Sequence, residues 1–178
     1  MKNNSQISYN IKSRTIKITS ISLLCTVSII LSILDDLIPV FPFLPPGAKL
    51  GLSNIATMFA SAQIGLGISL IIAVIKSLFV GITRGTTAFL MSFFAGIIST
   101  FITGFLLRTT KKHFSFIGIG IIGAITHNIA QLIVAISITC TTSLIYYLPV
   151  LIIFAIITGI LTGIALKTII PALEKIKF

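Results

Sequence analysis

The sequence predicts an all-α integral membrane protein, built as a bundle of six transmembrane helices. Hydrophobic residues make up 56% of the chain and charged residues only 9%, whereas soluble proteins carry roughly a quarter charged residues. The mean hydropathy is +1.15, and long apolar runs alternate with short polar or basic segments, as in multi-pass membrane proteins. We therefore expect the protein to lie in the cell membrane, with lipid around most of its surface.

The basic residues predict how the chain is oriented. The net charge is +10, but the cations stand at the ends of apolar runs and form no patch, so we expect no nucleic-acid partner. Most of them fall in the N-terminal tail, in the connection between the fourth and fifth runs, and at the C-terminus. The positive-inside rule then places both termini in the cytosol. These residues are Lys2, Lys12, Arg14, Lys17, Arg108, Lys111, Lys112, Lys167, Lys175 and Lys177.

The apolar runs divide the chain into a membrane domain and two tails. Residues 1–15 form a polar cytosolic tail that we expect to be disordered, and residues 171–178 form a basic cytosolic tail. The membrane domain covers residues 16–170. Its six expected helices are the runs 16–34, 47–62, 68–82, 87–107, 114–138 and 144–166.

The second run follows a proline-rich segment. Prolines at 39, 42, 45 and 46 prevent a regular helix before it, because each fixes the backbone and removes an N–H donor. Pro46 is acceptable in the first turn of a helix, so we expect the helix to begin at about Gly47. At about 16 residues this run is short for a crossing. Residues 63–67 then turn into the third run, so the two runs form a hairpin.

Lys49, Lys76 and Arg84 are the cations that the positive-inside rule does not explain. Lys76 lies about ten residues beyond the turn, roughly 15 Å deep. A charge there costs on the order of 3 kcal/mol or more unless it faces the bundle interior and finds a partner. The alternatives are that Lys49 extends to the headgroups and that Lys76 pairs with Asp35 or Asp36. We expect both acids at the outer surface, too shallow for that pair.

The fifth run adds polar side chains near mid-membrane. His127, Asn128 and Gln131 share one helical face by their i, i+3 and i, i+4 spacing. Each alone is typical of a hydrogen bond between helices, but together they favour a polar cavity. Small residues also form stripes on the fourth run (Ser92, Gly96, Ser99, Thr103) and on the sixth (Ala155, Gly159, Gly163), and we interpret both stripes as packing surfaces.

Several classes of site are missing from the sequence. There is no phosphate-binding Gly-x-x-x-x-Gly-Lys-Ser/Thr loop, no His-Glu-x-x-His motif and no Gly-x-Ser-x-Gly elbow. Cys25 and Cys140 lack the paired spacing of metal ligands. The chain has three acidic residues in all, too few for a convincing general acid/base pair. We therefore predict no catalytic residue, no metal site and no cofactor in this chain.

Three segments together resemble a known family. The segments Pro46–Ile55, Phe89–Thr100 and Gly123–Gln131 are similar, in that order, to the Gx transporter family, which is also labelled heptaprenyl diphosphate synthase component I. The resemblance extends over about residues 16–170. That family is similar in turn to the S components of energy-coupling-factor (ECF) transporters, which have six helices and a ligand pocket that opens to the outside.

The resemblance implies partners and site residues. In such systems a transmembrane coupling protein and separate ATPases supply the work, so ATP is used by the partners. It places Lys49, Asn54, His127, Asn128 and Gln131 at the family's polar positions. We add Lys76 and Arg84 from their charges. S components commonly dock through small residues of their first helix, and here Ser22 with Thr26, or Ser28 with Ser32, takes the place of the usual alanines.

Three functions follow as hypotheses. The first is an S component that captures a small anionic or phosphorylated solute through the residues named above. The second is a membrane accessory subunit of heptaprenyl diphosphate synthase, in isoprenoid or menaquinone biosynthesis. Prenyl diphosphate synthases use Asp-Asp-x-x-Asp motifs, and here Pro39 stands where the third aspartate belongs, so this chain is not expected to catalyse chain elongation. The third is a structural bundle that recruits partners.

Overall fold

The protein is helical throughout the part of the chain that its computed structural model describes, residues 2–37, 51–109 and 115–174. Six α-helices and one 3₁₀-helix make up these segments. They are α1 (Lys2–Leu37), α2 (Asn54–Gln63), α3 (Leu66–Arg84), α4 (Thr86–Thr109), α5 (Phe116–Thr139), η1 (Thr142–Tyr147) and α6 (Leu148–Glu174).

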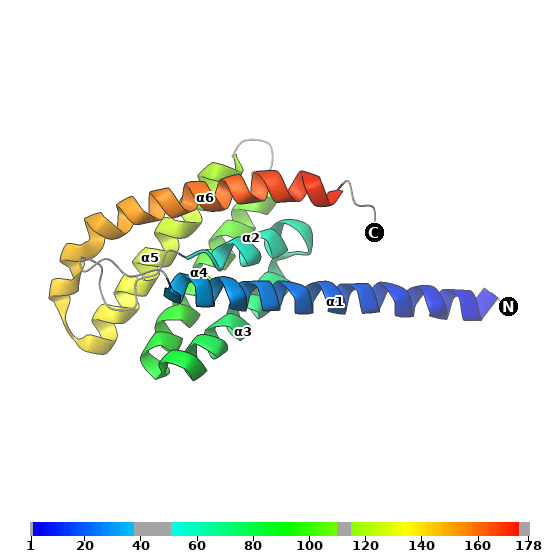
Figure 1. Ribbon diagram of the computed structural model, residues 1–178, viewed down its shortest axis with the longest axis horizontal. Helices are drawn as coiled ribbons and strands as arrows, with labels where there is room; N and C mark the ends of the chain where they lie inside the picture. The colour runs from blue at the N-terminus through cyan, green and yellow to red at the C-terminus, as the bar shows by residue number, and fades with distance from the viewer. Residues whose placement is uncertain (1, 38–50, 110–114, 175–178) are drawn as a thin grey trace.

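The helices pack as a bundle with a long helix at its edge. Helix α1 lies beside α2 and α3 and extends well beyond the other helices, while α3, α4, α5 and α6 follow one another as packed neighbours (Figure 1). The beginning of α1 and the end of α6 lie toward the same end of the molecule (Figure 1). We call this the basic end, because Lys17, Arg108 and Lys167 belong to it. The last turns of α1, α3 and α5, which carry Asp35, Arg84 and Thr139, lie toward the opposite end (Figure 1).

Five of the described helical segments are long and apolar enough to cross a membrane. They are Thr15–Asp35, Leu66–Arg84, Thr86–Thr109, Phe116–Thr139 and Thr142–Pro171. Each overlaps an expected span, so the multi-pass helical architecture is confirmed. Helix α2 is different: its 10 residues give a length of about 15 Å, half of a hydrocarbon core of about 30 Å.

The expected start of the second span is wrong. The helix begins at Asn54 and not near Gly47, and residues 51–53 form a turn before it. Gly51 has φ +76°, a left-handed conformation that glycine adopts without steric cost and that a continuing α-helix excludes. Lys49 and the four prolines of the preceding segment lie outside the described residues.

The expected disorder of the N-terminal tail is not what the backbone shows. Helix α1 already begins at Lys2 and continues without a break into the apolar span. The polar residues of the tail include good helix formers such as Lys, Arg and Gln. The apolar span is already helical, so the helix can extend into the tail without the free-energy cost of nucleating a new helix.

Glycines bring α5 and α6 into close backbone contact. A Cβ atom added to Gly120 would meet the backbone of Gly159, and one added to Gly159 would meet the backbone of Ile121. One added to Gly163 would meet the backbone of Ile117. The predicted packing stripe on the sixth run is therefore confirmed, as expected where small residues let membrane helices approach. This contact fixes α5, which carries much of the candidate site.

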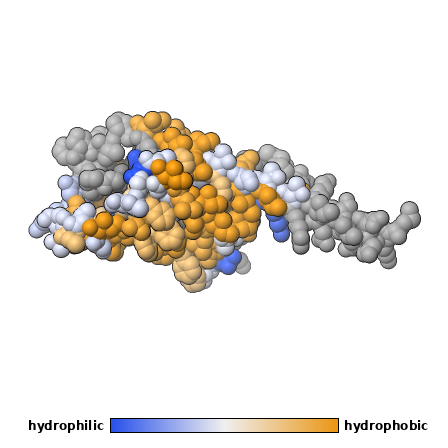
Figure 2. All heavy atoms as spheres, turned by 90° about the horizontal axis from the view of Figure 1, so that it is seen from below, coloured by the Kyte–Doolittle hydropathy of each residue, from blue (hydrophilic) through white to orange (hydrophobic). Residues whose placement is uncertain are grey.

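The outer surface of the bundle is apolar. Figure 2 shows hydrophobic residues over the middle of the molecule, with the hydrophilic ones toward its edges. Exposed leucine, isoleucine and phenylalanine side chains cover α1, α3, α4, α5 and α6, an exposure that is stable in lipid and unfavourable in water. Inside, one core cluster joins α2, α4, α5 and α6 toward the basic end, through Met58, Leu107, Ile119, Leu166 and Ile170.

Candidate functional site

A buried lysine lies at the centre of the candidate site. Lys76 of α3 is only 3% exposed, and its Nζ donates hydrogen bonds of 3.1 Å to Ser53 Oγ and to Asn54 Oδ1. A cation taken out of water needs such oxygen acceptors. The expectation that Lys76 faces the bundle interior and finds partners is confirmed. It ties α3 to the first residues of α2.

An aspartate holds the same turn from the other side. Asp35, in the last turn of α1, is 3% exposed. Its carboxylate accepts hydrogen bonds from the backbone N–H of Leu52 at 3.1 Å and of Ser53 at 3.4 Å. These donors precede α2, and the positive end of a helix dipole favours a negative charge there. Asp35 is therefore buried within the protein, where α1 packs beside α2 and α3, and its depth in the membrane stays a prediction.

Lys76 and Asp35 belong to the wall of a cavity of about 210 Å³, which we call the cationic chamber. Helices α1, α3, α4 and α5 and the turn before α2 all contribute to it. Its lining residues are Ser32, Asp35, Gly51, Ser53, Lys76, Val80, Arg84, Thr87, Ala88, Met91, Ser92, His127 and Gln131. Arg84, the last residue of α3, is exposed, so it stands at the mouth while Lys76 lies inside.

The chamber brings together the expected site residues of α3 and α5. Lys76 and Arg84, eight positions apart on one helix, meet His127 and Gln131 of α5 in the same cavity. The His127 ring is held by Ser99 of α4, whose Oγ lies 3.3 Å from Nδ1. Asn54 stands behind Lys76 as its hydrogen-bond partner, and it lines a small neighbouring cavity.

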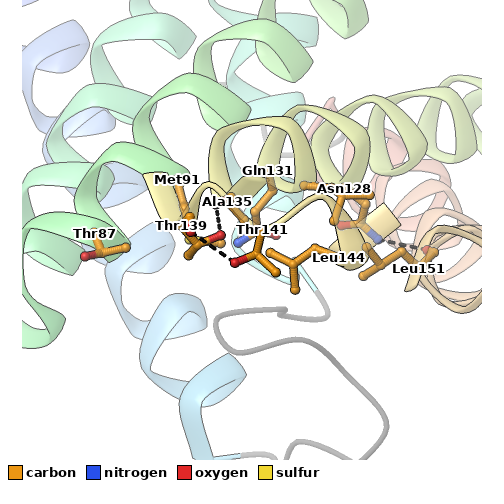
Figure 3. A pocket seen from close by; sticks show the side chains of 10 residues that line it. Thr87, Met91, Asn128, Gln131, Ala135, Thr139, Thr141, Leu144 and Leu151 are labelled. Atoms are coloured by element: carbon orange, nitrogen blue, oxygen red, sulfur yellow. Dashed lines mark hydrogen bonds between the residues drawn. The ribbon is translucent and has the colours of Figure 1, made fainter. Parts of the chain in front are cut away.

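Asn128 faces a different space from His127. Its Nδ2 donates a 3.0 Å hydrogen bond to the carbonyl oxygen of Leu151 in α6, and it lines a second cavity of about 210 Å³, which we call the apolar cavity (Figure 3). The lining residues are Thr87, Met91, Asn128, Gln131, Leu132, Ala135, Thr139, Thr141, Leu144 and Leu151. Of the expected α5 residues, only Gln131 borders both cavities.

Some residues of the chamber were not among the expected site residues. Asp35 was considered as an alternative partner of Lys76 but was expected at the outer surface, and Ser92 was interpreted as part of a packing stripe. Ser53 receives the Lys76 bond, although nothing marked it out from its neighbours. The sequence did contain an indication for Asp35. A mid-membrane lysine needs a partner, and a carboxylate that directly follows an apolar run is a candidate to be buried near that lysine.

The residues considered for partner docking divide between two faces of α1. Ser28 and Ser32 are buried, at 0% and 2% exposure, so they face the bundle. Ser22 and Thr26 are exposed, and Thr26 Oγ1 bonds back to the carbonyl oxygen of Ser22 at 2.9 Å. Only the second pair is open to contact from outside the bundle in this arrangement.

The chemistry available in the chamber is that of anion binding. Among the described lining residues, Arg84 and Lys76 carry positive charge, Asp35 supplies a carboxylate, and His127, Gln131 and Ser92 add hydrogen-bonding groups. Within the described residues, no three His, Cys, Asp or Glu side chains gather where they could hold a metal ion. The chamber thus offers charge and hydrogen bonds for a ligand with a negatively charged group.

Comparison with known proteins gives the chain a family. No curated protein and no solved structure matches it. The family model described as heptaprenyl diphosphate synthase component I matches residues 24–169. This range contains α2 to α5 entirely and every lining residue of both cavities. The matched residues thus form most of the helical bundle and the whole described lining of the cationic chamber. The chain belongs to the heptaprenyl diphosphate synthase component I family.

Proposed function

We propose that this protein is a membrane subunit that binds a small organic anion in the cationic chamber and works together with protein partners. The observation that carries the proposal is the burial of Lys76 at 3% exposure in a cavity that also contains Arg84 and His127. Ionisable groups at such depth are costly and mark binding or transport sites more often than structural ones.

The arrangement supports a stepwise capture of the anion. Arg84 stands exposed at the mouth, where it attracts a negative ligand from water. Lys76 lies deeper, where fewer water molecules compete and a charge interaction is stronger. His127, Gln131 and Ser92 then orient the ligand by hydrogen bonds. The carboxylate of Asp35 lowers the excess positive charge of the chamber.

The family points to an accessory role in prenyl diphosphate synthesis. In this role the protein would hold a phosphorylated substrate or product at the membrane, while a separate catalytic subunit carries out chain elongation. This division of labour agrees with the lack of an Asp-Asp-x-x-Asp motif in the sequence. The ligand would be a prenyl phosphate or diphosphate, and the partner a soluble synthase subunit.

The position of the chamber favours a second candidate, the S component of an uptake transporter. The connection from α3 to α4, which carries Arg84 and Thr87, lies at the end opposite to the beginning of α1 and the end of α6 (Figure 1). By the positive-inside rule the basic end is cytosolic, so the mouth would face outward. A coupling protein and ATPases would then be the partners, with the exposed Ser22 and Thr26 of α1 as a docking face.

Purification with native ligand tests the proposal. The wild-type protein, purified in lipid nanodiscs, is expected to release an organic anion that mass spectrometry identifies. Lys76→Gln should lose it, since glutamine keeps most of the side-chain length without the charge. Lys167→Gln, at an exposed position of α6, is the matched control and should retain it. Equal retention in both variants contradicts the proposal.

The identity of the ligand and partners decides between the two candidates. A prenyl phosphate together with a co-purifying synthase subunit supports the accessory role. A small polar solute together with co-purifying ATPases supports uptake. In either case the loss of ligand in Lys76→Gln is required.

A further inference from the structure

The geometry points to an amphiphilic ligand, an organic anion whose charged group lies in the cationic chamber and whose apolar chain lies in the apolar cavity. This ligand class rests on the anion-binding function proposed above. It adds an apolar chain to the charged group that Lys76 and Arg84 would bind.

The two cavities adjoin each other across α4 and α5. Thr87, Met91 and Gln131 line both of them, so among the described residues these three side chains border the charged space and the apolar space alike. Figure 3 shows Met91 of α4 and Gln131 of α5 beside the apolar cavity, with Leu144 and Leu151 on its other side. Of the three shared residues, Met91 has an unbranched side chain that can adopt other rotamers without moving the backbone.

Three polar side chains of the apolar cavity already donate hydrogen bonds within the protein. Asn128 Nδ2 bonds to the carbonyl oxygen of Leu151 at 3.0 Å. The hydroxyl of Thr139 bonds to the carbonyl oxygen of Ala135 at 2.8 Å, and that of Thr141 to the carbonyl oxygen of Thr139 at 3.0 Å. These donors are therefore spent on backbone carbonyls. Apart from Thr87 and Gln131, the rest of the lining is the apolar surface of Met91, Leu132, Ala135, Leu144 and Leu151.

The contrast with the chamber defines the ligand. The chamber contains Lys76, Arg84, Asp35 and His127, and none of these lines the apolar cavity. Ligand pockets usually combine an apolar wall with a few placed polar groups. Here the two kinds of wall occupy separate, adjoining spaces of about 210 Å³ each. A wholly polar anion would fill the cationic chamber and leave the apolar cavity empty.

Chain-length dependence tests this division. Methyl phosphate and butyl phosphate present the same charged group with chains that differ by three methylenes. Each buried methylene contributes about 0.8 kcal/mol, roughly fourfold in affinity. Calorimetry with the full chain in nanodiscs should therefore show butyl phosphate binding up to about 50-fold more tightly than methyl phosphate.

Filling the apolar cavity should remove that advantage. Ala135→Phe places a ring in the cavity and is expected to bring butyl phosphate down to the affinity of methyl phosphate. Ile133→Phe, two positions away on the exposed face of α5, is the matched control and should leave the preference intact. Retained binding of methyl phosphate shows that Ala135→Phe is folded, and Ala135→Leu offers a milder filling if it is not.

The remaining outcomes separate this inference from the proposed function. If Lys76→Gln weakens both phosphates but chain length has no effect in the wild type, the amphiphilic ligand is wrong and the anion site stands. If a chain-length effect persists unchanged in Ala135→Phe, the chain binds elsewhere and the inference is overturned. If neither phosphate binds in a Lys76-dependent way, the proposed function itself fails.

Discussion

At the scale of residues, Ser53 connects two charges of opposite sign. Its Oγ accepts from Lys76 Nζ at 3.1 Å, and its backbone N–H donates to Asp35 at 3.4 Å. Each charge thus obtains a hydrogen-bond partner in the turn before α2. Buried charges are tolerated when hydrogen bonds offset their desolvation. The turn is therefore both a structural junction and the floor of the cationic chamber.

Replacing Asp35 tests this junction. Asp35→Ala removes the acceptor of the Leu52 and Ser53 N–H groups, and an unsatisfied buried donor costs about 1–3 kcal/mol. The melting temperature of the purified protein should fall by several degrees, at about 2–4 °C per kcal/mol for a chain of this size. Ser22→Ala, on the exposed face of α1, is the control and should melt like the wild type. An unchanged Tm for Asp35→Ala would show that the turn does not depend on the carboxylate.

At the scale of elements, the α5 and α6 pair positions the site. Helix α5 carries His127 and Gln131, and its place is set by the glycine contacts with α6 on one side and by α4 on the other. On that second side, a Cβ added to Gly123 would meet the Thr103 side chain of α4. In lipid, such close packing replaces the hydrophobic driving force that holds soluble helices together. The chamber therefore depends on glycines that do not line it.

Two glycine-to-alanine substitutions distinguish the effect of this helix packing on stability from the effect of helix propensity alone. In Gly159→Ala the new Cβ meets backbone atoms of α5, which cannot move aside as a side chain can, so α5 must shift. We expect lower thermal stability, by roughly 1–3 kcal/mol as for other overpacked cores, and weaker ligand binding. Gly67→Ala in α3 meets no atom within 4 Å. It should be neutral or slightly stabilising, because alanine favours a helix over glycine.

The two glycine variants are compared by thermal unfolding in detergent and by ligand affinity in nanodiscs. A stability loss confined to Gly159→Ala indicates that backbone contact holds α5 and α6 together. Equal behaviour of the two variants would contradict the role given to these glycines.

At the scale of the whole molecule, the pattern of apolar runs was enough to predict a multi-pass helical protein, and the depth of Lys76 was enough to predict that it faces inward. Two features escaped this reasoning. The start of α2 depends on the left-handed Gly51 and on hydrogen bonds to Asp35, a contact between residues 17 or 18 positions apart. The division of His127 and Asn128 between two cavities depends on where α4 and α6 pack, which helical periodicity alone does not specify.

The orientation of the chamber across the membrane is testable with a native cysteine. Cys140 is exposed, in the turn between α5 and η1, at the end that holds Arg84. The positive-inside rule places that end outside the cell. A membrane-impermeant maleimide added to intact cells should label the wild-type protein, and Cys140→Ser should abolish the labelling, since Cys25 lies within the apolar span of α1. Arg108→Cys, introduced together with Cys140→Ser, should react only after the membrane is permeabilised.

The same labelling decides between the two candidate functions on physical grounds. A soluble prenyl diphosphate synthase works in the cytosol, so a chamber whose mouth faces outward cannot exchange ligand with it directly and favours uptake. If Cys140 is protected in intact cells while the cysteine at position 108 reacts, the basic end lies outside and the mouth faces the cytosol. That result would contradict the orientation derived from the charges and would favour the accessory role, because substrate and catalytic partner would then share one compartment with the chamber.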